Sequence, residues 1–134
     1  MFLFLQEWLN FHQNLQFLSQ LKQKFSEEYT EVIQTIDTLG IPFSVCTIYY
    51  AGPTEESEAK RVDVKGDVGL SGTDVVVDAF DSAIIDVANK AQNCKDIIDL
   101  RWLFDDPGCY ANPIEPSCTG GERITQRLMS FLKN

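Results

Sequence analysis

Apolar residues recur at three- and four-residue steps through much of the first forty positions. Over 13–39 they fall on one face of a helix, and Gly40 follows as a terminator. The apolar positions of this face are Leu15, Leu18, Leu21, Phe25, Tyr29, Val32, Ile33 and Ile36. The pattern predicts a long amphipathic helix over 13–39.

Two runs rich in β-branched and aromatic residues have the character of strands. The first, "FSVCTIYY" at 43–50, stands between Pro42 and the turn residues "AGP", and is typical of a strand buried on both faces. The second, "DIIDLRWLF", covers 96–104. We expect the two runs to be neighbouring parallel strands, because helices alternate with them along the chain.

Two further helices complete the pattern. Thr73 or Asp74 can cap the first, and "GGERITQRLMSFLKN" at 120–134 forms the last. The apolar face of the middle helix holds Val76, Phe80, Ala83, Ile84, Val87, Ala88 and Ala91. The order helix, strand, helix, strand, helix predicts an α/β fold with a parallel sheet covered on both faces.

The stretch 51–72 separates the first strand from the middle helix. It mixes glycines and charges with few large apolar residues, so we expect an exposed connection. A loop of about 20 residues is uncommon in a compact domain and marks either a function or a tolerated insertion.

The chain starts with the apolar run "MFLFLQEWLNF". Gln6, Glu7 and Asn10 interrupt it, so it predicts neither a signal peptide nor a membrane span, and a cytoplasmic location is the default expectation. Three roles are open: an extra strand formed by "MFLFL", docking onto the chain's own core, or contact with another protein, such as a dimer. Docking onto the core is favoured over an external partner.

Charge and cysteine content narrow the function. Twenty acidic residues against 11 basic ones give a net charge of −9, which disfavours binding to nucleic acids and to anionic lipid surfaces.

The four cysteines lack the paired C-x-x-C spacing of zinc sites, so no metal or other cofactor is predicted. They are Cys46, Cys94, Cys109 and Cys118. Cys46 and Cys94 are expected to be buried thiols, Cys109 and Cys118 could pair in an oxidising compartment, and the three pairings of four cysteines remain open.

The segments "VCTIYY", "IIDLRWLF", "YANPIEPS" and "GGERI" follow one another in a familiar order. Over about residues 25–134 this succession resembles the C-terminal half of the SGNH or GDSL hydrolases, a family of ester and acyl hydrolases. The resemblance implies a flavodoxin-like three-layer sandwich with a parallel sheet. It also implies that 1–134 is a single domain of that kind, incomplete or truncated because the nucleophile-bearing N-terminal blocks are absent.

The family's Asp-x-x-His-Pro motif falls on residues 112–116. Asn112 takes the position of the aspartate and Glu115 that of the histidine, so the resemblance implies these two as catalytic residues. No Gly-Asp-Ser block is present, and the only histidine, His12, is far from the motif. The implied function is an acyl-ester hydrolase fragment that is inactive by itself. The alternatives are a non-catalytic binding module derived from the family and an unrelated small α/β interaction domain.

A carboxylate at the position of the histidine changes the chemistry. Imidazole suits general base catalysis because its pKa lies near neutrality, whereas Glu115 requires burial to raise its pKa. Asn112 could orient the carboxyl group by hydrogen bonding, and Asp99 or Arg101 could brace it. A purely structural interpretation is also open, in which the prolines shape a turn and Ser117 caps the last helix.

Overall fold

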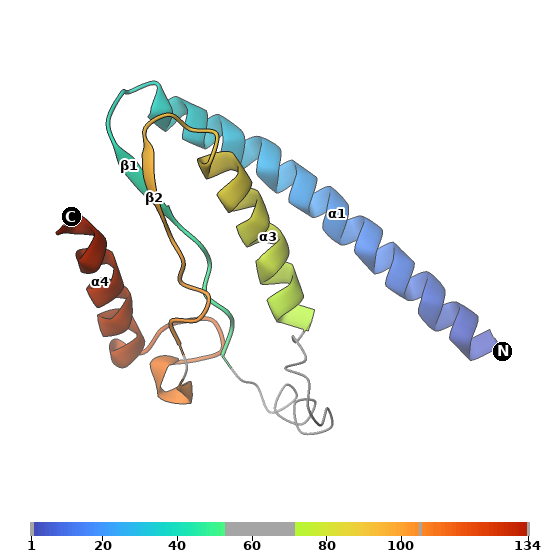
Figure 1. Cartoon of the computed structure of the whole chain (residues 1–134). Coiled ribbons are helices and arrows are strands. Elements are labelled where there is room, and N and C mark those ends of the chain that lie inside the picture. The colour runs from blue at the N-terminus through green and yellow to red at the C-terminus, as the bar shows by residue number, and fades with distance from the viewer. Residues whose placement is uncertain (1, 53–71, 105, 134) are drawn as a thin grey trace.

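The computed structural model describes residues 2–52, 72–104 and 106–133 (Figure 1). Its elements are α1 (Phe2–Asp37), β1 (Phe43–Cys46), α3 (Gly72–Ala88), β2 (Cys94–Ile98), the short 3₁₀ helix η1 (Pro107–Cys109) and α4 (Cys118–Leu132). The predicted alternation of helices and strands is confirmed for these elements, which form a mixed α/β structure. Of the connection predicted at 51–72, residues 53–71 lie outside the described part of the chain.

Helix α1 begins at Phe2, well before the predicted start at residue 13. The interpretation of "MFLFL" as a strand is therefore wrong. No glycine or proline precedes Gly40, so nothing in the sequence breaks the helix near its start. Gly40 ends the turn after α1 with φ of 67°, a left-handed conformation that glycine adopts without strain.

Strands β1 and β2 pair in parallel, as predicted. Val45 lies opposite Ile97, and Ser44 lies opposite Asp96. Only one face of β1 is covered, because Val45 is buried while Ser44 and Cys46 are exposed. The predictions that this strand is buried on both faces and that Cys46 is a buried thiol are therefore wrong, since a two-stranded sheet leaves its outward side chains near solvent.

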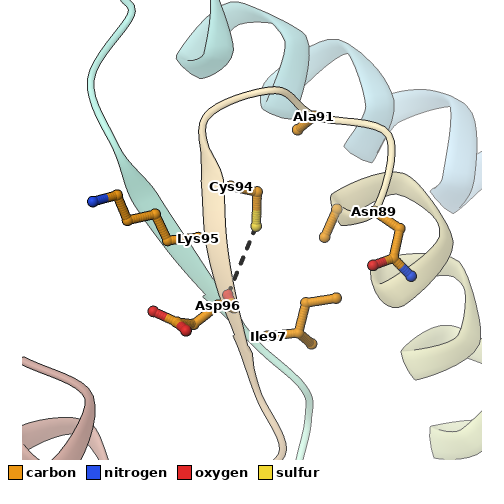
Figure 2. Close-up of a pocket in the computed structure, with 7 residues that line it drawn as sticks. Asn89, Ala91, Cys94, Lys95, Asp96 and Ile97 are labelled. Carbon is orange, nitrogen blue, oxygen red and sulfur yellow. Dashed lines mark hydrogen bonds between the residues drawn. The ribbon is translucent and has the colours of Figure 1, made fainter. Parts of the chain in front are cut away.

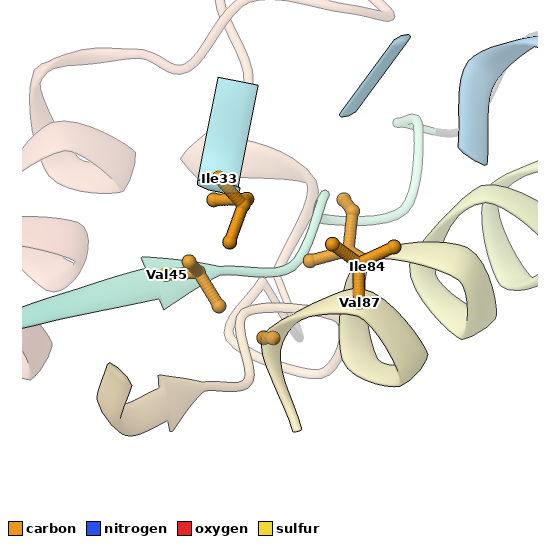
Figure 3. Close-up of a cluster of buried hydrophobic side chains, with 5 residues drawn as sticks. Ile33, Val45, Ile84 and Val87 are labelled. Atoms are coloured by element: carbon orange, nitrogen blue, oxygen red, sulfur yellow. The ribbon is translucent and has the colours of Figure 1, made fainter. Parts of the chain in front are cut away.

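The core lies where α1 and α3 cover the same face of the strand pair. Figure 3 shows Ile33 of α1 facing Val45 of β1, with Ile84 and Val87 of α3 beside them; Ala88 completes the buried cluster. The partly buried residues around the cluster are Phe25, Tyr29, Phe43, Ala91, Cys94 and Ile97. Helix α4 contacts β2 from the opposite side of the strand pair (Figure 1).

The N-terminal half of α1 projects away from this core (Figure 1). Leu5 and Leu9 remain 55% and 46% exposed, so the expectation that the apolar terminus docks onto the chain's own core is wrong for these side chains. A helix of 36 residues is about 54 Å long, whereas strands of four or five residues extend only about 15 Å. The strand pair is too short to lie beneath the whole helix.

Neighbouring residues of α1 provide a test of this core. Ile33 is 4% exposed, so Ile33→Ala should lower the free energy of unfolding by about 2–5 kcal/mol through lost burial and a residual cavity. Val32 is 54% exposed, and Val32→Ala should change the free energy of unfolding by less than about 0.5 kcal/mol. Urea denaturation measures both; equal effects would contradict the described packing of α1.

Candidate functional site

The segment that follows η1 folds back on itself. Tyr110 and Pro116 form an antiparallel bridge, and the backbone N–H of Ala111 donates to the carbonyl oxygen of Glu115 at 2.9 Å. The N–H of Ser117 donates to the carbonyl of Cys109 at 2.8 Å. We call residues 110–117 the hairpin loop. Its two ends are thus held together by backbone hydrogen bonds.

Asn112 and Glu115 are brought together within this loop. The side-chain oxygen Oδ1 of Asn112 accepts hydrogen bonds from the backbone N–H groups of Ile114, at 2.9 Å, and Glu115, at 2.8 Å. Its Nδ2 donates to Oε2 of Glu115 at 2.6 Å. Asn112 therefore shapes the turn and orients the carboxylate with the same amide group.

The hairpin loop is fixed to the residues that follow β1. The Tyr110 hydroxyl donates to the carbonyl of Tyr50 at 2.7 Å, and the N–H of Gly52 donates to the carbonyl of Pro113 at 2.8 Å. A Cβ at Gly52 would lie 2.8 Å from the Tyr110 ring, so only glycine fits beneath it. The loop consequently lies beyond the carboxyl ends of the parallel strands, where open α/β sheets usually bind ligands.

Glu115 itself is exposed. Tyr49 lies nearby, because its hydroxyl donates to the carbonyl of Ile114 at 2.8 Å, and burial followed by the charge of Glu115 raises the pKa of Tyr49. Asp99 and Arg101 do not brace Glu115 but bond to each other, with Nη2 and Oδ2 2.6 Å apart. The described residues therefore orient Glu115 without giving it the burial that a base would need.

The start of α4 explains the rest of the motif structurally. Ser117 is the N-cap, as predicted, and its Oγ accepts from the N–H of Gly120 at 3.2 Å. A Cβ at Gly120 would lie 2.1 Å from the carbonyl oxygen of Cys109, whereas one at Gly121 would meet nothing within 4 Å. The close approach of α4 to η1 thus requires a glycine at position 120.

A second polar group, which the sequence interpretation missed, lies at the same ends of the strands. The Tyr50 hydroxyl donates to Oδ1 of Asp78 at 2.6 Å, and burial followed by this bond raises the pKa of Tyr50 to about 12. Arg101 lies 3.6 Å from Asp78 and hydrogen-bonds Asp99, which lowers the pKa of Asp99 to about 2. The sequence could have revealed this polar group through the spacing of Asp74, Asp78 and Asp81, which places three carboxylates on one face of α3.

Asp81 is the buried member of that face, with no exposed surface. Its Oδ1 accepts from the N–H of Ile48 at 2.7 Å, just beyond β1, while Oδ2 is buried and has no hydrogen-bond partner among the residues that the structure describes. Burial raises the pKa of Asp81, and the bond from Ile48 lowers it in part. The carboxyl group links α3 to β1, but its second oxygen is desolvated without compensation.

A pocket of about 280 Å³ lies at the other end of β2 (Figure 2). Figure 2 shows Lys95 and Asn89 pointing to opposite sides, so their polar groups do not converge on one ligand. Cys94 donates to the carbonyl of Asp96 at 3.7 Å.

All four cysteines are free thiols, Cys109 being buried and Cys118 exposed. Within the described ranges, no group of three or more His, Cys, Asp or Glu side chains is arranged to hold a metal ion.

No protein-family model matches the chain, and comparison with curated proteins and with solved structures likewise finds no match. None of the helices in the part that the structure describes combines the length and apolar character needed to cross a membrane. The site is therefore interpreted from its own geometry.

The two glycines at the start of α4 make a matched pair. Gly120→Ala should destabilise the protein by about 1–3 kcal/mol or more, because its methyl group collides with the Cys109 carbonyl. Gly121→Ala should be neutral or stabilise by up to about 1 kcal/mol, since alanine favours helix. Thermal unfolding compares them; a tolerated Gly120→Ala would disprove the close contact between α4 and η1.

Asp81 predicts a pH dependence. The pKa of Asp81 is raised in the folded state, so the native state binds a proton more readily than the unfolded chain does. The ionised carboxylate therefore lowers the free energy of unfolding at neutral pH. This effect disappears as the pH falls through the folded pKa towards 3.8. Asp81→Asn retains an oxygen for Ile48 and should equal or exceed wild-type stability at pH 7, with the difference shrinking near pH 4. Urea denaturation at both pH values measures it.

Asp81→Ala is the control, because it leaves the N–H of Ile48 unpaired and should cost about 1–3 kcal/mol at both pH values. If Asp81→Asn is as destabilising at pH 7 as Asp81→Ala, the buried carboxylate is stabilised by its surroundings and this account of Asp81 is incorrect.

Proposed function

We propose that this chain carries the carboxylate half of an SGNH-type active site that hydrolyses small acyl esters. Glu115 is the general base and Asn112 orients it. The observation that carries the proposal is the 2.6 Å hydrogen bond from Asn112 to Oε2 of Glu115, within a loop at the carboxyl ends of parallel strands. The parent fold would be a flavodoxin-like three-layer sandwich, to which the strand pair and its helices contribute.

In this mechanism Asn112 occupies one carboxylate oxygen of Glu115 and leaves Oε1 to accept the proton of a serine hydroxyl. The serine oxygen attacks the acyl carbon, and the proton passes from Glu115 to the departing alcohol. Water then hydrolyses the acyl-serine in the same way. No Gly-Asp-Ser block occurs among the 134 residues, so the serine must come from a segment outside them.

The same segment would also have to cover Glu115. A carboxylate in water is a weak base near neutral pH, and Glu115 is exposed among the described residues. Covering it would remove the carboxylate from water, which makes it a stronger base, and would exclude water from the acyl intermediate. The proposal therefore requires the 134 residues alone to be inactive towards esters.

A non-catalytic binding module is the second candidate. It is favoured by the hairpin loop, in which Tyr110, Asn112 and Ser117 each have a structural role that requires no catalysis. In that case a serine-bearing partner segment would be unnecessary. The chain would be expected to fold alone and to show no turnover with any acyl ester.

The decisive variant is Glu115→Gln in the protein encoded by the reading frame extended upstream, which should contain a Gly-Asp-Ser block. The loss of the base should lower turnover of p-nitrophenyl acetate by about 10²- to 10⁴-fold. Glu122→Gln, an exposed neighbour on α4, is the matched control and should leave the rate unchanged.

Wild-type turnover in Glu115→Gln would eliminate Glu115 as the base. An extended frame without a serine block, together with a folded but inactive chain, would reject the hydrolase proposal and support the binding module.

A further inference from the structure

One peptide unit of the hairpin loop, between Ile114 and Glu115, is hydrogen-bonded on both sides. Its carbonyl oxygen, on Ile114, accepts from the Tyr49 hydroxyl at 2.8 Å. Its N–H, on Glu115, donates to Oδ1 of Asn112 at 2.8 Å. Because a peptide unit is planar, two bonds on opposite sides fix the rotation of the whole unit. The backbone from which the Glu115 side chain extends is thereby fixed as well.

The two bonds come from different parts of the chain. Asn112 belongs to the hairpin loop itself, whereas Tyr49 lies three residues after the end of β1. The Ile114 side chain is 74% exposed, so its backbone carbonyl, and not its side chain, makes the attachment to Tyr49. Tyr49 therefore connects the peptide of Glu115 to the strand pair.

The Tyr49 ring is held by neighbouring aromatic residues. It packs at a tilt against Phe104, with ring centroids 4.8 Å apart, and Phe104 packs edge-on against Tyr110 at 5.0 Å. Burial followed by the charge of Glu115 raises the pKa of Tyr49, so its hydroxyl remains a donor at neutral pH. The hydroxyl thus reaches the Ile114 carbonyl from a ring whose orientation is set by packing.

The adjacent tyrosine bonds to a different element. The Tyr50 hydroxyl donates to Oδ1 of Asp78 in α3 at 2.6 Å. The two neighbouring hydroxyls therefore have separate partners, α3 for Tyr50 and the hairpin loop for Tyr49. Removing one or the other hydroxyl makes a matched comparison.

We propose that Tyr49 is a positioning residue for Glu115, which it affects only through the backbone and Asn112. Without the Tyr49 hydroxyl, the peptide unit can rotate and carry the N–H of Glu115 away from Oδ1 of Asn112. The same amide group of Asn112 donates through Nδ2 to Oε2 of Glu115 at 2.6 Å, so the carboxylate loses its orientation too. The catalytic consequence rests on the proposed function, whereas the positioning of Glu115 does not.

Amide hydrogen exchange of the 134-residue chain, followed by NMR, tests the positioning directly. Tyr49→Phe keeps the ring against Phe104, and loss of the hydroxyl should speed exchange of the Glu115 amide about two- to tenfold. Tyr50→Phe is the matched control and should leave this rate unchanged, because its hydroxyl bonds Asp78. A wild-type rate in Tyr49→Phe, or equal acceleration in both variants, would overturn the proposal.

Steady-state kinetics of the protein extended upstream test whether Tyr49 acts through Glu115. Tyr49→Phe should lower kcat for p-nitrophenyl acetate about three- to tenfold and leave KM within about twofold, because a positioning residue does not bind the ester. In a Glu115→Gln background the same change should cause no further loss. An equal loss in both backgrounds would mean that Tyr49 acts independently of Glu115 and would reject the proposal.

Failure of the proposed function and failure of this role for Tyr49 give different results. If Glu115→Gln has wild-type turnover, Glu115 is not the base, and the exchange rate of its amide alone decides whether Tyr49 positions it. If Glu115→Gln is slow while Tyr49→Phe keeps the wild-type kcat, Glu115 remains the base and the role of Tyr49 is disproved.

Discussion

Val45 clusters with Ile33 of α1 and with Ile84 and Val87 of α3, and the rest of the structure depends on this packing. A pair of short parallel strands has few hydrogen bonds and is only marginally stable without apolar cover. The two helices provide that cover on one face and fix the direction in which both strands leave the core. Because the strands are parallel, the segments after β1 and β2 emerge at the same end, where the hairpin loop and the polar residues of α3 lie.

The polar groups at that end have two different characters. Asp81 is buried and bonded to the N–H of Ile48, so it ties α3 to β1 at the expense of a desolvated carboxyl oxygen. Glu115 is oriented by Asn112 and anchored indirectly through Tyr110, yet it is exposed. Glu115 is thus oriented but exposed to solvent, whereas Asp81 is bonded and fully buried.

Periodicity predicted the elements well where one face dominates, as in the helix containing Phe25, Tyr29 and Ile33, and the capping preference of serine predicted the Ser117 cap. It failed at the start of α1, because an apolar terminus of this composition suits a strand or a helix equally. It also failed for the outward face of β1, since the apolar run 43–50 cannot reveal how many strands flank it. The pairing of Asn112 with Glu115 followed from the motif, whereas the burial of Asp81 depends on packing between α3 and β1, which sequence spacing does not determine.

Strands β1 and β2 are parallel neighbours in the register that places Val45 opposite Ile97, and the position of the hairpin loop depends on this pairing. Nuclear Overhauser contacts between backbone protons of the isotopically labelled chain test it most directly. The structure predicts inter-strand contacts around Val45 and Ile97 in the parallel pattern, advancing together along both strands to Cys46 and Ile98. An antiparallel pattern, or the absence of contacts between 43–46 and 94–98, would contradict the fold and, with it, the placement of the hairpin loop at the strand ends.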